Sequence, residues 1–521
     1  MSDIQKQFAV FFAYLVRFYD TFNLIMTKAI VIGAGFSGIA TATTLASKGF
    51  DVTVLEKNQS AGGRARKFHA DGFTFDMGPS WYWMPDVFDN YFARFGKKTS
   101  DYYTLDRLDP SYTIVFGEND FLDIPADPDA FKAMLEELEP GSSEQLDKFL
   151  SQAAYKYQVG INDLVYKPSR SIFEFVDIRL LTALFRMDVF TSFHKHIRKF
   201  FKNEKILQLM EFPILFLGAL PQNTPALYSL MNYADISLGT WYPRGGMHKI
   251  IEGMVRLAEE KGVKFVYDCT VKEFDYTGGN IKKVVTQNAA EEIKTYEAEV
   301  VVGSADYHHI ESEILPQGLR SYSEKYWDKR TMAPSSLIFY LGINKKLENL
   351  RHHNLFFDVD FMQHAKEIYE TPRWPEHPLF YLSVVSKTDP ASAPEGCENL
   401  FVLVPVAHDL DDNEEIREKY YNIVMERLEK LTGQSVRDAV IYKRSYAHND
   451  FKKDYNAFKG NAYGLANTLM QTAILKPSLK SKKVKNLYYA GQLTVPGPGV
   501  PPTLISGQVV AKEIEKDFMR K

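Results

Sequence analysis

Apolar and polar positions at the start of the chain follow the order of a β–α–β unit. Residues 29–32 (AIVI) form an apolar run, which predicts a short buried strand. A stretch with apolar residues at helical spacing follows and ends at Gly49. Residues 51–55 (DVTVL) predict a second strand, with Glu56 at its end. The pattern therefore predicts two buried strands joined by a helix.

Glycines occupy the turn between the first strand and the helix. Gly33 and Gly35 let the backbone turn tightly and approach a pyrophosphate, and Gly38 lets the helix pack closely on the strand. The helix N-terminus offers unpaired N–H groups and the positive end of its dipole to the phosphates. Glu56 lies 23 residues after Gly33, a spacing at which an acid accepts hydrogen bonds from a ribose. The stretch predicts a dinucleotide site.

A second glycine pair follows the acid in residues 58–65 (NQSAGGRA). Gly63 and Arg64 would bring another backbone segment and a cation to the same pyrophosphate, which fits a large, permanently held cofactor. This continuation resembles the flavoproteins of the amine oxidase superfamily, so FAD is preferred over NAD.

Downstream patterns predict that the nucleotide-binding sheet is assembled from distant segments. Residues 68–76 alternate like a β-hairpin with Asp71-Gly72 as its turn. Helical patterns dominate from 85 to about 240, for example at 127–138 and 143–157. A helix after residues 241–247 is followed by segments that we expect to add to the sheet holding the nucleotide, namely 263–267, 270–276, 281–286 and 296–306.

The last third of the chain predicts a second sheet and another cofactor-contacting turn. Apolar runs at 335–341 and 400–406, with an amphipathic helix at 411–431, suit a sheet that covers a ligand cavity. A strand at 486–492 leads into a Pro/Gly-rich turn and a helix over 507–514. A turn of this kind on a helix N-terminus is a second phosphate- or flavin-binding element.

Length, charge and cysteine content exclude several classes of protein. A chain of 521 residues predicts two or three domains with interleaved segments. Its net charge of −4 lacks the excess of basic residues that is typical of nucleic-acid-binding proteins. Cys269 and Cys397 are too few for a disulfide framework and lack a metal spacing, so a reducing cytosol is the default. His308 and His309 have no carboxylate cluster spaced to join them, so a structural role is favoured over a metal or acid–base pair. We expect no metal.

Residues 1–26 precede the dinucleotide unit. The apolar run at 8–16, flanked by Lys6 and Arg17, is too short to span a bilayer and no cleavage site of a secretory signal follows it. We expect Met26 to be the native start, with a membrane-surface helix as the competing interpretation.

Residues 170–205 interleave basic side chains with large apolar ones, at 8 Lys/Arg against 4 Asp/Glu. This composition describes a helix lying on an anionic membrane surface, and an ordinary amphipathic helix packed in the fold is the alternative. The apolar stretch at 206–220 is interrupted by Glu211 and Pro213, so it is too short and broken to span a membrane.

Residues 81–84 (WYWM) form an aromatic cluster directly after the Gly78-Pro79-Ser80 turn. Core packing is the simpler interpretation of such a cluster in isolation. Its position after a flavin-type turn makes it a candidate lining beside the isoalloxazine.

Together these segments resemble the bacterial-type phytoene desaturases, the carotenoid desaturase family of the FAD-dependent amine oxidase superfamily. The resemblance covers nearly everything from Thr27 onward, and its motifs lie at 31–38, 56, 62–65, 72–79, 241–246, 393–397 and 490–501. Many members of the superfamily have an acid after the final Ala-Gly, where this chain has Gln492. A ribityl contact by that side chain is therefore not expected from the resemblance.

The expected fold is α/β. It consists of a Rossmann-like FAD-binding domain built from discontinuous segments, a mixed-sheet substrate domain and a helical, membrane-facing insert. The expected boundaries are 27–84, 241–310 and 440–521 for the FAD-binding domain, 85–165 and 311–439 for the substrate-binding domain, and 166–240 for the insert. The residues expected to contact FAD are Gly33, Gly35, Gly38, Glu56, Gly63, Arg64, Gly78, Pro79, Val271, Gly491, Val500 and Pro501.

The resemblance implies that phytoene or a similar apolar polyene is drawn from a membrane surface into an apolar tunnel. Two hydrogens leave adjacent carbons for each new conjugated double bond, and a membrane quinone or oxygen accepts the electrons. The expected location is the cytoplasm, at the inner face of the cell membrane. Because an allylic carbocation is delocalised, we hypothesise that orientation and a dry site suffice, with no essential catalytic side chain.

Other functions remain open on the sequence. A carotenoid 3,4-desaturase, a carotenoid isomerase or a retinol saturase would share these motifs. A non-enzymatic binder of prenylated proteins is the alternative from another class, since the escort proteins of small GTPases share the fold, but such a binder would not need the full set of glycines with Glu56 and Arg64.

Overall fold

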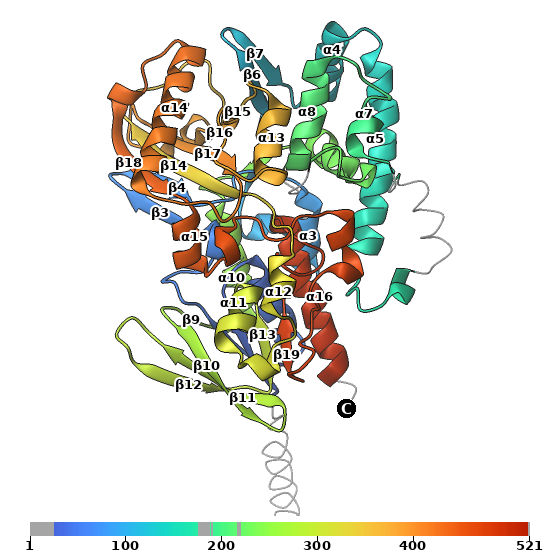
Figure 1. Ribbon diagram of the computed structural model, residues 1–521, viewed down its shortest axis with the longest axis vertical. Helices are drawn as coiled ribbons and strands as arrows, with labels where there is room; N and C mark the ends of the chain where they lie inside the picture. The colour runs from blue at the N-terminus through green and yellow to red at the C-terminus, as the bar shows by residue number, and fades with distance from the viewer. Residues whose placement is uncertain (1–25, 176–187, 189–190, 216–219, 519–521) are drawn as a thin grey trace, which may run out of the picture.

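The computed structural model describes residues 26–175, 188, 191–215 and 220–518 (Figure 1). Residues 1–25 of the expected extension, residues 176–187 and 189–190 of the expected membrane helix, and residues 216–219 of the stretch at 206–220 lie outside these residues. Those interpretations remain predictions.

A five-stranded parallel sheet carries the first β–α–β unit. β1 (Lys28–Ile32) is its central strand, between β13 (Val300–Gly303) and β2 (Asp51–Leu55), and β19 (Leu487–Tyr489) and β9 (Lys264–Val266) form the two edges. The strands come from positions that span most of the chain, as expected for a discontinuous cofactor domain. Their near-continuous apolar sequences suit a parallel sheet that is buried on both faces.

Helices cover one face of this sheet. Alternate residues of β1, Ala29 and Val31, pack with α2 (Phe36–Ala46), which contacts α10 (His248–Glu260) and α16 (Val500–Phe518). A Cβ at Gly507 in α16 would lie 2.3 Å from the carbonyl oxygen of Ser37 in α2. The two helices therefore pack this closely only because residue 507 is a glycine.

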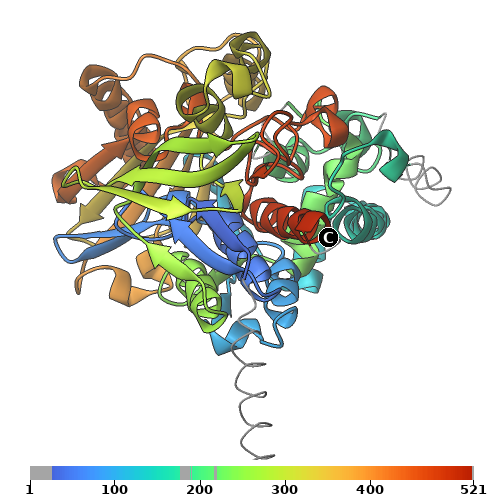
Figure 2. The ribbon, with the colours of Figure 1, turned by 90° about the horizontal axis from the view of Figure 1, so that it is seen from below.

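The other face of the parallel sheet packs against a separate three-stranded antiparallel sheet of β10 (Thr270–Thr277), β11 (Asn280–Gln287) and β12 (Ile293–Glu297). Figures 1 and 2 show this layer beside the blue β1–β2 segment. The expectation that all of these strands extend the nucleotide sheet is wrong, since only β9 and β13 join it. Gly278 and Gly279, both with positive φ, form a tight reversal that pairs β10 with β11 instead.

The segment expected as one strand at 296–306 is divided. β12 ends at Glu297 and β13 begins at Val300 in a different sheet. Asp306 then caps the short helix α11 (Tyr307–His309), and its carboxylate accepts a hydrogen bond from the N–H of His309.

A seven-stranded mixed sheet forms the other half of the molecule (Figure 1, upper left). Its strands, in spatial order, are β18 (Val440–Tyr446), β14 (Ser335–Ile343), β17 (Glu398–Val406), β16 (Phe380–Ser383), β15 (His353–Phe356), β6 (Tyr112–Gly117) and β7 (Asp120–Ile124). Alternate residues of β14 pack on α14 (Glu414–Thr432), and those between them face the first half. Since β18 pairs with β14, the strand pairing keeps residues 440–446 with this sheet, although the sequence placed the boundary at 440.

Helices between residues 128 and 215 stand to the side of both sheets (Figure 1, upper right). They are α4 (Pro128–Leu138), α5 (Ser142–Val159), α7 (Phe193–Ile197) and α8 (Glu204–Leu215), and the first two match the predicted ranges to within two residues. In the part of the chain that the structure describes, no helix combines the length and apolar character needed to cross a bilayer.

Candidate functional site

A cavity of about 450 Å³ is lined by residues from both halves of the molecule. Part of its wall comes from the turns after β1, β2 and β19, and another part from the seven-stranded sheet and α13 (Phe361–Tyr369). All of the residues expected to contact FAD line this cavity except Gly38.

The glycine turn after β1 has the geometry that the sequence predicted. Gly33 has φ +102°, and a Cβ there would lie 3.2 Å from backbone atoms of Ser304 and Ala305. A Cβ at Gly35 would have no atom within 4 Å, so this residue borders open space. A Cβ at Gly38 would lie 2.0 Å from the carbonyl oxygen of Gly33, which explains why Gly38 serves packing rather than the cavity.

The Glu56 carboxylate is 4% exposed and lies at the end of β2. Its Oε2 accepts a hydrogen bond from the Ala34 N–H at 2.8 Å, and its Oε1 accepts from the Asn58 backbone N–H at 2.9 Å and from the Asn58 side chain at 2.7 Å. A carboxylate has about four acceptor positions, so Glu56 keeps capacity for a ligand hydroxyl.

The second glycine pair, Gly62 and Gly63, packs against the glycine turn after β1. The Gly62 N–H donates to the Ala34 carbonyl at 2.8 Å, and a Cβ at Gly63 would lie 3.5 Å from the Cα of Gly35. Two backbone segments therefore approach each other at the cavity wall without side chains between them. Gly78 packs in a similar way, since a Cβ there would lie 2.5 Å from the Arg64 carbonyl oxygen.

Arg64 brings a buried positive charge to the cavity. Its Nη2 donates to the Asn461 carbonyl at 3.2 Å, and its Nε has no hydrogen-bond partner among the described residues. Burial lowers the pKa of this guanidinium, and Asp306 partly opposes that effect. A buried cation with unused donors fits an anionic ligand in the cavity.

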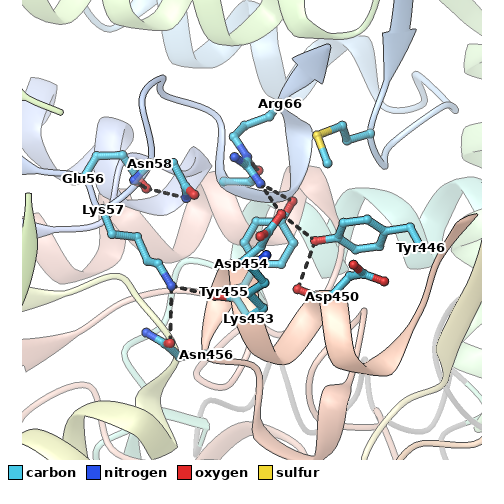
Figure 3. A network of polar contacts seen from close by, with 12 residues as sticks. Glu56, Lys57, Asn58, Arg66, Tyr446, Asp450, Lys453, Asp454, Tyr455 and Asn456 are labelled. Carbon is cyan, nitrogen blue, oxygen red and sulfur yellow. Dashed lines mark hydrogen bonds and ion pairs between the residues drawn. The ribbon is translucent and has the colours of Figure 1, made fainter. Parts of the chain in front are cut away.

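A network of polar contacts joins the loop after β2 to α15 (His448–Tyr455), as Figure 3 shows. Arg66 forms an ion pair with Asp454 at 2.7 Å, and the Lys57 ammonium donates to the Lys453 carbonyl at 2.8 Å and to Asn456 at 3.4 Å. We call residues 453–456, three of which line the cavity, the α15 clasp.

Tyr455 of the clasp lies against two guanidinium groups, at 5.0 Å from Arg64 and 5.4 Å from Arg66. Sequence reasoning missed these clasp residues. They follow Lys57 by almost 400 positions, and their local sequence is merely polar and lysine-rich, so it contains no signal for this contact.

The C-terminal turn differs from its prediction. α16 begins at Val500 instead of Gly507, so the predicted start is wrong. The two prolines after Val500 suit the first turn of a helix, since that turn needs no N–H donors. Because Pro501 and Pro502 have no N–H, this helix end offers few donors to a phosphate and suits contact with a ring better. Gly491 has φ +123°, and the Gln492 amide donates to Asn461 at 3.2 Å.

Val271 completes the set of cavity residues expected from the sequence. It is the second residue of β10 and lies in the same wall as Glu56 and Cys269.

Among the described residues, no cluster of His, Cys, Asp and Glu is arranged to hold a metal ion. His308 stacks on Phe458 at 3.9 Å and contacts Glu324 at 3.0 Å, whereas His309 lines the cavity, so the structural role expected for the pair stays a prediction for His309.

The rest of the cavity wall is largely apolar. It is formed by Trp81, Trp83, Phe212, Met231, Leu355, Phe357, Phe361, Leu379, Tyr381 and Leu403. Of the predicted aromatic cluster, Trp81 and Trp83 line the cavity, whereas Tyr82 is buried and bonds Tyr103 at 3.0 Å. Core packing is therefore confirmed for Tyr82, and the position of Trp81 and Trp83 beside an isoalloxazine stays a prediction.

A buried polar chain holds Trp83 in place. The indole N–H donates to Thr240 at 2.8 Å, Thr240 donates to Asp235 at 3.2 Å, and the Tyr112 hydroxyl donates to Asp235 at 2.7 Å. Burial raises the pKa of the Asp235 carboxyl to about 7, against the opposing effect of these hydrogen bonds. The network fixes one aromatic wall of the cavity.

These features together fit a dinucleotide in the cavity. The glycine segments leave room for close approach of a pyrophosphate, the unpartnered Nε of Arg64 can donate to an anion, and Glu56 retains acceptor capacity for a ribose. The aromatic part of the same cavity then lies beyond the dinucleotide and suits an apolar molecule.

Comparisons with known proteins agree with this geometry. Residues 36–515 match the family described as flavin containing amine oxidoreductase. The chain is 42% identical over 489 residues to a carotenoid 3,4-desaturase of Haloarcula japonica, covering 94% of this chain and 98% of that protein. It is 32% identical to a zeta-carotene-forming phytoene desaturase of Myxococcus xanthus, covering 94% and 93%. An oxidoreductase structure from Methanosarcina mazei has a TM-score of 0.59 at 16% identity, covering 93% of this chain and all of that one, and so shares the fold.

Proposed function

Because the chain belongs to the flavin containing amine oxidoreductase family, we propose that it is an FAD-dependent carotenoid desaturase, which introduces conjugated double bonds into a linear carotenoid precursor. The observation that carries this proposal is that residues suited to bind a dinucleotide and an aromatic and aliphatic wall line one and the same cavity. The desaturase names of the two relatives support it.

FAD is held, in this proposal, by the residues that the sequence singled out. The turn at Gly33 and Gly35, with Gly63 and Arg64, receives the pyrophosphate, and Glu56 binds a ribose. Val271 would lie by the adenine, while Gly78, Pro79, Gly491, Val500 and Pro501, which line the same cavity, would border the isoalloxazine. When bound, the flavin accepts a hydrogen together with its electron pair.

The protein contributes orientation and the exclusion of water. A linear polyene offers no polar group to recognise, so binding depends on apolar contact with walls such as Trp81, Phe357 and Leu403. A rigid wall aligns one pair of adjacent carbons with the flavin, which lowers the entropic part of the barrier.

Two desaturation reactions are separate candidates. Phytoene desaturation towards lycopene is the reaction that the sequence motifs favour, and 3,4-desaturation is supported by the higher identity, 42% against 32%, to a protein with that name. The test is expression in one host that accumulates phytoene and in another that accumulates lycopene, followed by chromatography of the pigments. New chromophores from phytoene support the first reaction, and a longer chromophore from lycopene alone supports the second. Unchanged pigments in both hosts contradict the proposal.

The proposal extends to contact with a membrane surface. A long apolar polyene is stored in a bilayer, so the protein has to meet its substrate there. Large apolar side chains are exposed at Phe173 (80%) and Met470 (73%), and Ile474 and Leu475 are also exposed. We place the protein at the inner face of the cell membrane, with a membrane quinone or oxygen as electron acceptor.

Vesicle flotation tests the membrane contact. The double variant Met470→Glu/Ile474→Glu is expected to lose binding to anionic vesicles, since it places charges on the apolar surface. Ile441→Glu, at an exposed isoleucine on β18, is the matched control and should float like the wild type. Equal flotation of all three proteins, or no flotation of the wild type, contradicts membrane contact through this surface.

A further inference from the structure

Tyr381 is a polar side chain in the apolar part of the cavity. It belongs to β16, lines the cavity with Ser80 and Trp81, and its ring centre lies 5.5 Å from that of Trp81. Its strand pairs with β15, so that Leu355, another cavity residue, lies opposite Tyr381. The Tyr381 ring is therefore part of the cavity wall, and Ser80 and Ser383 lie near its hydroxyl.

His353 lies directly behind this phenol. Because it precedes Leu355 by two residues on β15, it occupies the same face of the sheet. The Tyr381 hydroxyl and the His353 Nδ1 are 2.6 Å apart, and the imidazole stacks on the Trp81 ring at 4.2 Å with an interplanar angle of 12°. The stacked Trp81 ring and the short contact with Tyr381 together fix the position of the imidazole.

The other ring nitrogen of His353 has no partner. Nε2 is fully buried and makes no hydrogen bond within the described part of the chain. His364 in the same wall uses both nitrogens, since its Nδ1 accepts from the Leu379 N–H and its Nε2 donates to the Pro405 carbonyl, both at 2.9 Å. Nδ1 of His408 and of His448 also has no partner among the described residues, so the role of His353 is argued from its contact with Tyr381.

We propose that Tyr381 and His353 accept the proton that leaves the substrate, Tyr381 as a catalytic residue and His353 as the positioning residue behind it. The inference rests on the proposed function, and it departs from the expectation that no side chain is essential. One hydrogen departs with its electron pair to the bound flavin. The other leaves the adjacent carbon as a proton, and its bonding pair becomes the second bond of the alkene.

The proton transfer balances within the pair. The phenol oxygen takes the substrate proton while its own proton passes to the Nδ1 of His353, which leaves a neutral tyrosine and an imidazolium. We assign the resting tautomer with the proton on Nε2, because Nδ1 then accepts from the phenol. After the product leaves, entering water receives the proton from the imidazolium through Tyr381.

The basicity of the His353 imidazole suits this proton transfer. Burial, and to a lesser extent His352, lowers the pKa of His353 well below its usual value, so the imidazole is neutral at rest. An allylic carbocation is a far stronger acid than an imidazolium, so a weak base suffices. The depressed pKa also favours release of the proton before the next turnover.

Tyr381→Phe, His353→Gln and a matched control test the pair. Tyr420→Phe is the control, since its buried phenol donates to the Pro375 carbonyl and lies outside the cavity wall. We expect kcat to fall roughly 100-fold or more in Tyr381→Phe, within the usual range for a lost proton acceptor, with KM and flavin content unchanged. His353→Gln should lose a similar factor, and Tyr420→Phe should match the wild type. A Tyr381→Phe rate within about twofold of the wild type overturns the proposal.

A second measurement does not depend on turnover. In protein labelled with 15N-histidine, the ring signals that disappear in His353→Gln are assigned to His353. The Nδ1 signal is expected at the position of a hydrogen-bonded, unprotonated nitrogen in the wild type, and it should shift in Tyr381→Phe. An unshifted signal overturns the pair. A wild type that converts no carotenoid contradicts the proposed function instead, so the two failures are distinguishable.

Discussion

The Arg64 guanidinium lies 5.0 Å from the centre of the Tyr455 ring, although 391 positions separate the two residues along the chain. This contact joins the glycine-rich segment after β2 to α15, and both residues line the cavity. Because the guanidinium is buried and uses one described hydrogen bond, its remaining donors are available to the cofactor.

Replacing Arg64 by methionine is expected to weaken flavin binding roughly 10- to 100-fold. The change removes charged hydrogen bonds to the pyrophosphate and keeps the volume of the side chain. The measurement is the dissociation constant for FAD, obtained by titrating the apoprotein. Arg94→Met is the matched control, since Arg94 lies over Tyr166 and outside the cavity wall. Equal affinity of Arg64→Met and the wild type would remove Arg64 from the site.

Loosening the α15 clasp is expected to accelerate flavin release. Lys57→Met removes the donor to the Lys453 carbonyl, and Asp454→Asn weakens the ion pair with Arg66. The ion pair is partly buried and the Lys57 contact is exposed, so Asp454→Asn should raise the dissociation rate of FAD several-fold and Lys57→Met should raise it less, as measured by fluorescence of the released flavin. Lys452→Met on the same helix, where the lysine is 3.9 Å from Asp409, should leave the rate unchanged. Identical release rates in all variants contradict a retaining role of the clasp.

Two glycines in the first turn are expected to respond differently to alanine. At Gly35 the backbone is extended and a new methyl group meets no protein atom, so Gly35→Ala should fold normally and bind FAD at least 10-fold more weakly. At Gly38 the methyl group would lie 2.0 Å from a carbonyl oxygen, so Gly38→Ala should lower the free energy of unfolding by about 1–3 kcal/mol. Urea unfolding of the apoproteins and FAD titration separate the two effects. An unstable Gly35→Ala apoprotein would contradict the open space at that residue.

The raised pKa of the Asp235 carboxyl predicts that the stability of the protein depends on pH. Burial raises its pKa in the folded protein to about 7, whereas the unfolded value is 3.8, so the folded state binds more protons between these limits. The contribution to stability is complete below pH 4 and is lost as the pH rises to 7, by about 1.4 kcal/mol per pH unit in the middle of that range.

Asp235→Asn removes this titration while keeping one acceptor for Tyr112. Urea unfolding of both proteins from pH 5 to pH 7 is expected to show a less negative slope in the variant, and the difference isolates Asp235 from other groups. Indole fluorescence reports the same transition, because Thr240 links Asp235 to Trp83. Parallel slopes in the two proteins would show that Asp235 stays ionised throughout.

Local sequence determined the first part of the site well. The strand, turn, helix and acid at 28–56 were predicted because their residues contact one another within a short segment, and hydrophobic periodicity reports such contacts directly. The two sheets and the helices α4, α5, α10 and α14 were predicted for the same reason.

Long-range partners could not be predicted in this way. The sequence pattern of the hairpin β10–β11 does not differ from that of other apolar strand pairs. Only its packing against Ile30 and Val301 shows that it forms a layer of its own. Tyr381 and His353 lie on separate strands whose register is not encoded in either strand alone. The start of α16 was placed too late because Pro501 and Pro502 were interpreted as a turn, although proline is favourable in the first turn of a helix.

The order of strands in the parallel sheet has a consequence for biosynthesis. β1 and β2 leave the ribosome first, but β13 and β19 complete the sheet, and β19 ends at Tyr489. Gly491, which borders the cavity, follows that strand. A growing chain therefore lacks one wall of the cofactor site until Gly491 has left the ribosome. Stable cofactor loading thus has to follow the synthesis of all five strands of the parallel sheet.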